Sequence, residues 1–213
     1  MKRNIKMKKI IYILFFTLLL GYSVQAQTGL TAVSWGLATA QNEDMQNFVG
    51  TDMNLRGFGV DMRFFIKHRL TAGFSLRWDI FSAEIDKLMS VRSDELNGDI
   101  SGKQWRYINT FPIMANMHYY FGNRNKVQFY LGGNAGLSYI RERFDIGVFT
   151  LEASNWHFTV VPEAGLTYPI TRETRLYANL RYNYSVEAGN SITGDPSSFA
   201  YFGIDLGLAF YYW

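Results

Sequence analysis

Apolar and polar residues alternate along most of the chain after residue 27, with the period of two that is typical of β-strands. Over 56–66 the even positions after Arg56 are apolar, whereas their odd neighbours are two glycines, two charged residues and one phenylalanine. The alternation resumes over 70–80, directly after the basic segment 67–69. Two alternating runs joined by so short a polar connection predict a β-hairpin.

The same pattern predicts two further hairpins and one strand near each end of the alternating region. The expected strands are Leu30–Thr39, Arg56–Ile66, Leu70–Ile80, Trp105–Phe121, Val127–Arg141, Trp156–Tyr168, Arg175–Val186 and Phe199–Trp213. We expect no helix, linker or low-complexity segment to interrupt them. The sequence therefore predicts an all-β fold of eight strands.

The expected connections alternate between short and long. The short ones are 67–69, 122–126 and 169–174 and are mostly basic, and the long ones are about 40–54, 82–104, 142–155 and 187–198 and are mostly acidic. An even number of antiparallel strands with short turns at one end and long loops at the other is typical of bacterial outer-membrane barrels. We therefore predict a transmembrane antiparallel up-and-down β-barrel with meander topology. Its acidic loops face the cell exterior, and its basic turns and both termini face the periplasm.

A soluble barrel would alternate in the same way with its apolar face turned inward, so other features must decide between the two orientations. The four lysines after residue 26 all fall in expected turns or loops, whereas a water-facing strand surface normally carries lysine. They are Lys67, Lys87, Lys103 and Lys126. Aromatic residues gather near both strand ends, as the two interfacial belts of a membrane barrel require. The belt expected at the long loops contains Trp35, Trp78, Trp105, Tyr107, Tyr139, Trp156 and Tyr184, and the other contains Phe64, Tyr119, Phe121, Phe129 and Tyr168.

Residues 1–26 have the pattern of a secretory signal peptide, with five basic residues, an apolar run over 10–20 and the small-residue site Val24-Gln25-Ala26. A retained anchor is the alternative, but the run is shorter than the roughly 20 residues that a spanning helix needs. Cleavage before Gln27 changes the net charge from +3 to −2, which argues against a nucleic-acid partner. The 213 residues include no cysteine, which excludes a disulfide scaffold or a thiolate metal site. We expect residues 27–213 to form the barrel domain.

Over about residues 28–213 the chain resembles the small eight-stranded outer-membrane β-barrel family, the OmpX-, OmpA- and OmpW-like group. The signal ending Val24-Gln25-Ala26 is similar to those of Bacteroidetes-type secreted proteins. Family members usually end in an aromatic residue that the assembly machinery recognises, and this chain ends Phe210-Tyr211-Tyr212-Trp213. The alternation places Tyr212 on the apolar face and Trp213 one position out of phase. Either Tyr212 therefore takes the terminal role or Trp213 twists outward. The resemblance implies a location in the cell outer membrane, with outer-membrane lipid, lipopolysaccharide and the assembly machinery as partners.

An eight-stranded barrel is just wide enough for side chains to fill it, so we interpret the polar face as a packed plug. The expected ion-pair residues of the lumen are Asp61, Arg63, Arg77, Asp79, Glu163, Arg181 and Asp205. The turn at 169–174 places Glu163 directly opposite Arg181, and we expect these two to pair. The first hairpin makes Asp61 and Arg77 diagonal neighbours, within reach of each other. A proton or ion pathway along these residues is the alternative interpretation.

The three histidines are His68 in a turn, His118 on the polar face opposite Tyr130, and His157 on the polar face near the long loops. Neither His118 nor His157 has a serine or threonine nucleophile motif around it that matches barrel enzymes acting on lipid A, and no cluster has metal-ligand spacing. We therefore expect lumen histidines without catalytic, cofactor or metal-binding roles.

Two functional hypotheses remain. The first is a non-enzymatic surface protein whose barrel displays acidic loops for contact with an extracellular or envelope partner, or for envelope integrity. The alternative is a narrow channel for small or apolar solutes, as in OmpW-like relatives. An enzyme that modifies lipid A is a distant third.

Overall fold

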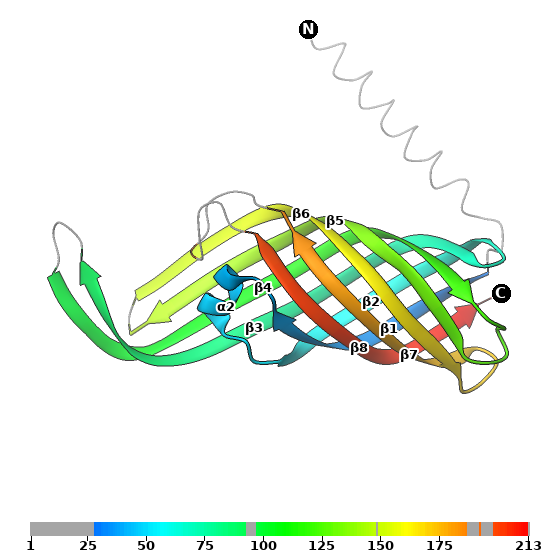
Figure 1. The fold of residues 1–213 in the computed structure, drawn as a ribbon, viewed down its shortest axis with the longest axis horizontal. Helices are drawn as coiled ribbons and strands as arrows, with labels where there is room; N and C mark the ends of the chain where they lie inside the picture. Colours follow the sequence, from blue (N-terminus) through cyan, green and yellow to red (C-terminus); the bar gives the residue numbers. More distant parts are fainter. Residues whose placement is uncertain (1–27, 93–96, 148, 187–191, 193–197, 213) are drawn as a thin grey trace, which may run out of the picture.

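The computed structural model describes residues 28–92, 97–147, 149–186, 192 and 198–212, which form eight strands and one helix (Figure 1). The strands are β1 (Gly29–Ala40), β2 (Asn54–Lys67), β3 (Leu70–Arg92), β4 (Asn97–Phe121), β5 (Gln128–Ile146), β6 (Phe149–Pro169), β7 (Thr174–Ser185) and β8 (Phe199–Tyr212). The helix, α2 (Glu43–Val49), lies between β1 and β2. The expected signal peptide and Trp213 lie outside the described residues.

Each strand pairs antiparallel with its neighbours in sequence, and β8 pairs with β1 to close the barrel. The closing ladder runs from Gly29–Tyr212 to Ala40–Tyr201. Closure gives every strand a paired neighbour on both sides where the barrel crosses the bilayer, which is the condition for a sheet to lie in lipid. The predicted eight-stranded antiparallel meander is confirmed.

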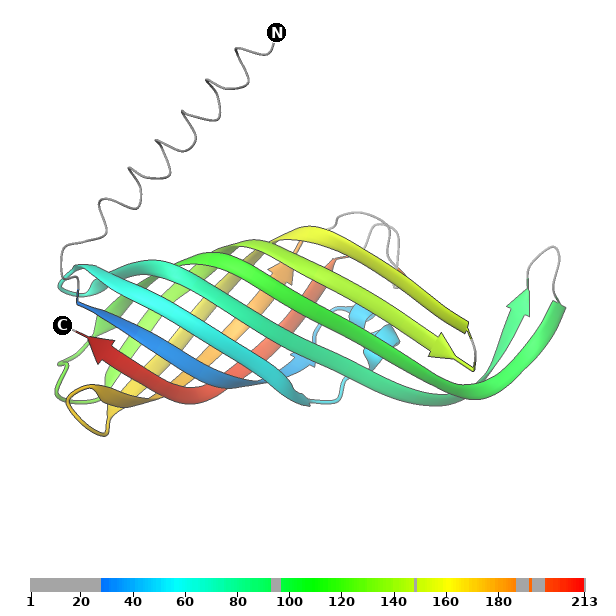
Figure 2. The same cartoon turned by 180° about the vertical axis from the view of Figure 1, so that it is seen from behind.

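The two ends of the barrel differ. Turns 68–69, 122–127 and 170–173 lie at one end, here called the short-turn end, where β1 begins and β8 ends. Figure 1 shows this end on the right, with the start of β1 beside the end of β8. The opposite, long-loop end carries α2 and two strand pairs that extend well beyond the rest of the barrel, and Figure 2 shows the β3–β4 pair bending away from it.

Two of the expected long loops are mostly β-structure, so the prediction of loops at 82–104 and 142–155 was wrong. The β3–β4 ladder continues to Arg92–Asn97 and the β5–β6 ladder to Ile146–Phe149. Beyond the bilayer a strand no longer needs an apolar outer face, so its alternation disappears from the sequence although its backbone pairing continues. As a result Lys87 and Lys103 lie on strands, and the expectation that all four lysines occupy turns or loops was also wrong.

The expectation of no helix was wrong as well, because residues 43–49 form α2. Met45, Phe48 and Val49 of this short helix are buried, and they pack on apolar residues at the long-loop end of the lumen. Seven residues are too few for a helical period to stand out in the sequence. In the described part of the chain, no helix is long and apolar enough to span a membrane.

The outer face of the barrel is apolar and exposed. Trp35 is 64% exposed near the long-loop end and Phe129 is 57% exposed near the short-turn end. Between these belts the outward positions of the strands are mostly apolar, including Phe74, Ile113 and Leu137. So large an exposed apolar surface on a closed barrel is the property of a membrane-spanning barrel, and a soluble barrel would bury these side chains.

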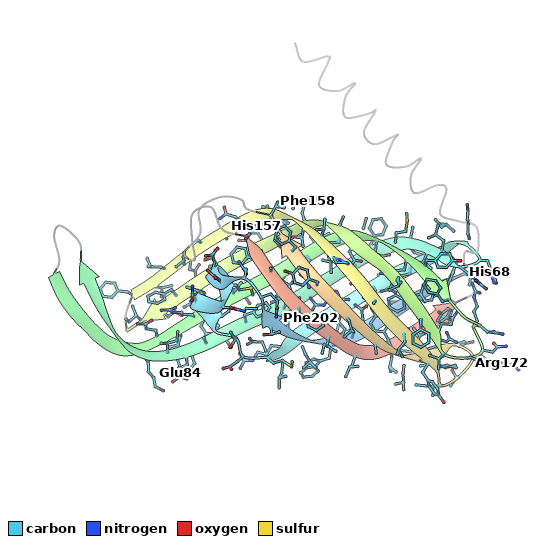
Figure 3. All side chains as sticks on the ribbon, in the orientation of Figure 1. His68, Glu84, His157, Phe158, Arg172 and Phe202 are labelled. Carbon is cyan, nitrogen blue, oxygen red and sulfur yellow. The ribbon has the colours of Figure 1, made fainter. Side chains whose placement is uncertain are left out.

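The packing of α2 generates a first prediction. Phe48 is only 6% exposed, so Phe48→Ala should remove about 3–5 kcal/mol of packing that holds α2 in the barrel mouth. The barrel wall keeps its hydrogen bonds, so the variant should remain folded while α2 detaches more often. Cleavage after Glu43 by a glutamate-specific protease should therefore be faster, and the band of the unboiled, folded barrel on gels should persist. The control Phe158→Ala alters an outward side chain (Figure 3) and should leave the cleavage rate unchanged. Equal rates of cleavage after Glu43 in the two variants would contradict the packing of α2.

Candidate functional site: the filled lumen

The inward side chains form three layers along the barrel axis. The lower apolar cluster, toward the short-turn end, contains Leu30, Ala32, Tyr120, Tyr130, Tyr177, Ala209 and Tyr211. The charged cluster lies in the middle and contains all the ion-pair residues expected from the sequence, each of them buried: Asp61, Arg63, Arg77, Asp79, Glu163, Arg181 and Asp205. The upper apolar cluster contains Ala38, Ala40, Met45, Phe48, Val49, Phe81, Ile108, Ile140, Phe144, Ile146, Phe199 and Tyr201.

Arg77 contacts three carboxylates of the charged cluster. Its Nη2 lies 2.9 Å from Asp61 Oδ2 and 3.8 Å from Glu163 Oε1, and its Nη1 lies 2.7 Å from Asp205 Oδ2. These carboxylates belong to β2, β6 and β8, so one guanidinium group from β3 joins strands on opposite sides of the lumen. Arg77 is thus the main connection within the cluster, and the structure brings it to Asp61 as the hairpin register requires.

The other two guanidinium groups complete the network. Arg181 donates from Nη2 to Asp79 Oδ1 at 2.7 Å and from Nε to Asp205 Oδ2 at 3.1 Å. Arg63 lies 3.4 Å from Glu163 Oε2. Every carboxylate of the cluster therefore has an arginine partner, which offsets the large cost of burying charge.

Tyrosine hydroxyl groups surround the charged cluster, and their hydrogen-bond partners were not anticipated from the sequence. Arg63 donates hydrogen bonds to Tyr120 and Tyr177 at 3.0 and 3.1 Å, and Tyr201 donates to Asp79 at 3.0 Å. The guanidinium group of Arg63 also lies 4.5 Å from the ring centre of Tyr130. The inward parity of these tyrosines was visible in the sequence, but their partners lie on strands across the barrel.

The expected ion pair between Glu163 and Arg181 does not form, although the two residues are direct cross-strand neighbours as predicted. Glu163 instead accepts from Asn134 at 2.6 Å and lies 3.0 Å from His118 Nε2. Both side chains extend across the lumen, where each finds partners on other strands. Cross-strand distance alone therefore does not determine pairing inside a narrow barrel.

The prediction that His118 lies opposite Tyr130 was wrong by two residues. The last pair of the β4–β5 ladder before the turn is Phe121–Phe129, and this register places His118 opposite Gly132. The His118 ring still contacts the Tyr130 ring diagonally, with 5.4 Å between centres. His157 lies 2.9 Å through Nδ1 from the Val186 carbonyl oxygen. Both histidines are thus held inside the barrel by structural contacts.

Glycines make room for the large charged side chains. Gly59 faces Arg77 and Gly203 faces Arg181 across their ladders. A Cβ atom at these glycines would lie 2.9 Å from Arg77 Nη1 and 2.6 Å from Arg181 Cζ. Alternation of small and large residues is how a barrel of this width fills its interior.

The long-loop end of the lumen is closed by α2 and its contacts. Arg106 donates to the carbonyl oxygen of Asn47 at 3.1 Å, and its guanidinium carbon lies 5.4 Å from the ring centres of both Phe48 and Phe144. The side chain of Asn42 makes two hydrogen bonds to the backbone at the start of β8. Its Nδ2 donates to Ser198 O at 2.6 Å, and its Oδ1 accepts from Ala200 N at 3.0 Å. These contacts hold α2 in the barrel mouth.

Metal chemistry has no support in the described lumen, where no three histidine or acidic side chains are grouped so that they could hold a metal ion. The carboxylates are instead engaged by arginine, asparagine and tyrosine. The arrangement can hold the barrel wall together. Ser138 faces His157 across the β5–β6 ladder, and its hydroxyl accepts a hydrogen bond from Thr159 at 2.7 Å.

No protein-family model and no curated protein sequence matches the chain. Among solved structures, the chain is similar to Ail, the attachment invasion locus protein of Yersinia pestis, with 12% identity, a TM-score of 0.50, and coverage of 88% of this chain and 100% of Ail. Ail in complex with the heparin analogue sucrose octasulfate has a TM-score of 0.52 at the same identity and coverage. OprG from Pseudomonas aeruginosa has 11% identity and a TM-score of 0.50, with coverage of 88% of this chain and 97% of OprG. The fold is therefore that of the small outer-membrane β-barrels.

The network generates a second prediction. Arg77→Met leaves three carboxylates with fewer partners, and breaking a buried pair in this way costs about 3–5 kcal/mol. This loss of unfolding free energy should be measurable by urea unfolding in lipid vesicles, with the folded fraction read from the difference in gel migration between unboiled and boiled samples. Arg141→Met breaks an exposed pair with Glu152 and should cost at most about 1 kcal/mol.

The partners can be tested by double substitution. Arg77→Met with Asp205→Asn should cost less than the sum of the single changes, because the two side chains are in contact. Glu163→Gln with Arg181→Met should show weaker coupling than the first pair, because these two side chains are connected only through Arg77 and Asp205. Strong coupling in the second pair and none in the first would refute this assignment of partners.

Proposed function

We propose that the chain is an integral outer-membrane protein whose filled barrel anchors a projecting surface sheet, and that it is neither an enzyme nor an open channel. The observation that carries this proposal is the lumen, in which a charged cluster lies between two apolar clusters and α2 closes the mouth. Such packing leaves the outward parts of the long-loop end as the region available for contact with other molecules.

The projecting sheet consists of the parts of β3, β4, β5 and β6 that extend past the aromatic belt (Figure 1). Its outer face is charged: Arg141 donates to Glu152 at 2.8 Å, and Arg143 donates to Asp145 at 2.8 Å. A hydrogen bond from Thr150, together with Arg143, holds the pKa of Asp145 below its ordinary value. Asp145 therefore keeps its charge and its pair with Arg143 under mildly acidic conditions.

The inner face of the same sheet is partly apolar. Phe149 and Leu151 on β6 are 63% and 58% exposed. Among the described residues, the contacts of β6 with the β7 side end at the hydrogen bond from Val186 N to Phe158 O. Residues 149–157 of β6 therefore form a ladder with β5 alone and are an edge of the described sheet, beside these apolar side chains. An edge of this kind suits an extended segment of a protein partner, which can add as a further strand. We propose an extracellular or envelope protein as the partner.

The partners during biogenesis and in the membrane follow from the same proposal. Outer-membrane lipid and lipopolysaccharide would contact the apolar face between the belts, and the assembly machinery would insert the barrel. Tyr212 faces outward as the last described residue of β8, in the position where an aromatic terminal signal would be exposed.

Conductance separates this proposal from the alternative of a narrow solute channel. The purified full chain in planar lipid bilayers should give no steady conductance steps, because charged and apolar side chains fill the lumen. Insertion is verified in vesicles from the same preparation by the difference in gel migration before and after boiling. Regular steps from correctly inserted protein would support the channel and reject the filled lumen.

The orientation can be tested with single cysteines, since the chain has none of its own. Thr150→Cys lies on the projecting sheet and Asn123→Cys lies in a turn at the short-turn end. An impermeant thiol reagent added to whole cells should label the first and leave the second unlabelled until the cells are opened. The reverse labelling pattern would show that the barrel is inserted the other way round.

A further inference from the structure

A groove of about 540 Å³ lies on the outer face of the barrel, over β5, β6 and β7. Its floor is made of small residues, Ala164 and Ala178, and its walls include Phe129, Leu131 and Leu180. The three strands run side by side on the near face of Figure 1, from yellow-green to orange. The groove is thus a depression in the lipid-facing surface and is separate from the filled lumen.

The shape of the groove follows from the register. Ala164 pairs with Leu131 on one side and Leu180 on the other, so a small side chain lies between two large ones. Ala178 is flanked in the same way by Leu166 and Leu206. Outward side chains on paired strands lie side by side, so the leucines form the walls of the groove and the two alanines form its floor. Water gains little in an apolar depression of this kind, whereas a hydrocarbon chain can fill it.

One end of the groove reaches a basic rim. Phe121 and Phe129 line the groove and also flank the β4–β5 turn, which carries the exposed Lys126. The β6–β7 turn, 170–173, carries the exposed Arg172 at the same end of the barrel (Figure 3). Glu173 is the single acidic residue of these two described turns.

Buried Arg175 links these two turns. It is the second residue of β7 and donates through Nη2 to the backbone carbonyl oxygen of Lys126 at 3.1 Å, and also to that of Arg124. Its Nη1 donates to Gln128 at 2.6 Å. The β4–β5 turn is therefore held against the start of β7, which keeps its basic side chains at the end of the groove.

We propose that the groove and the two basic turns form a binding site for one anionic phospholipid. An acyl chain lies in the groove, and the phosphate lies beside Lys126 and Arg172, where basic residues near a membrane surface attract anionic head groups. This inference rests on the proposed function, since acyl chains surround this face only when the barrel spans a bilayer. A second copy of the chain fits less well, because two parallel barrels meeting at this face would bring their basic turns together.

The test is native mass spectrometry of the full chain in detergent with phosphatidylglycerol or phosphatidylcholine of identical acyl chains. The wild type should retain one phosphatidylglycerol molecule in preference to phosphatidylcholine. Ala178→Phe fills the groove and should lower phosphatidylglycerol binding about tenfold or more, since losing contact with only two methylene groups has this effect. The control Ala135→Phe places the same bulk on an exposed outward position of β5 outside the groove and should bind as the wild type does.

Head-group recognition is tested separately. Lys126→Gln and Arg172→Gln should each reduce the preference for phosphatidylglycerol about fivefold and leave phosphatidylcholine binding unchanged. The control Lys67→Gln removes an exposed charge at the end of β2, in the other hairpin of the short-turn end. Equal binding of both lipids by folded wild-type protein would overturn the lipid site alone. A dimer that Ala178→Phe abolishes would assign the groove to a second copy instead. Failure of the wild type to give a folded band before boiling would overturn the membrane barrel and the site with it.

Discussion

The width of an eight-stranded barrel is the constraint on which the rest of this structure depends. Because lipid offers no hydrogen-bond partners, the sheet must close, and the β1–β8 ladder closes it along its full length. Closure with eight strands leaves an interior that only side chains can fill. The inward residues must therefore fit together as in a protein core, while the outward residues need only be apolar. These two demands explain the large charged residues facing glycines inside and the Trp and Phe belts outside.

Charge inside so narrow a space must be balanced locally. Arg77 reaches carboxylates on three strands, and Arg181 and Arg63 engage the carboxylates that remain. A network of this kind is strongly penalised when one member is lost, so it favours one arrangement of the barrel wall. Each of the four acidic side chains has an arginine partner, which fits a structural role. The apolar clusters above and below then separate the charges from both ends of the lumen.

The sequence predicted the barrel well and its interior contacts poorly, for one physical reason. Lipid requires every second residue of a strand, the one that faces outward, to be apolar. All eight strands could therefore be recognised wherever they cross the bilayer. Outside the bilayer the parity is lost, and the upper parts of β3 to β6 and the helix α2 went unrecognised. The burial of the seven charged residues followed from parity, but their partners did not, because Glu163 and Arg181 each reach across the lumen to strands distant in sequence. Local register could place Asp61 beside Arg77 only because both belong to one hairpin.

The same constraint indicates where function can reside. Residues between the belts must satisfy lipid on one side and a packed lumen on the other, so a change there alters stability first. The projecting sheet is free from both demands, yet β6 carries exposed Phe149 and Leu151 beside an incomplete ladder. Apolar side chains in water lower stability or solubility unless something covers them. Neither lipid nor the lumen requires this part of the described barrel to be apolar, and contact with a protein partner is the reason we propose for these side chains.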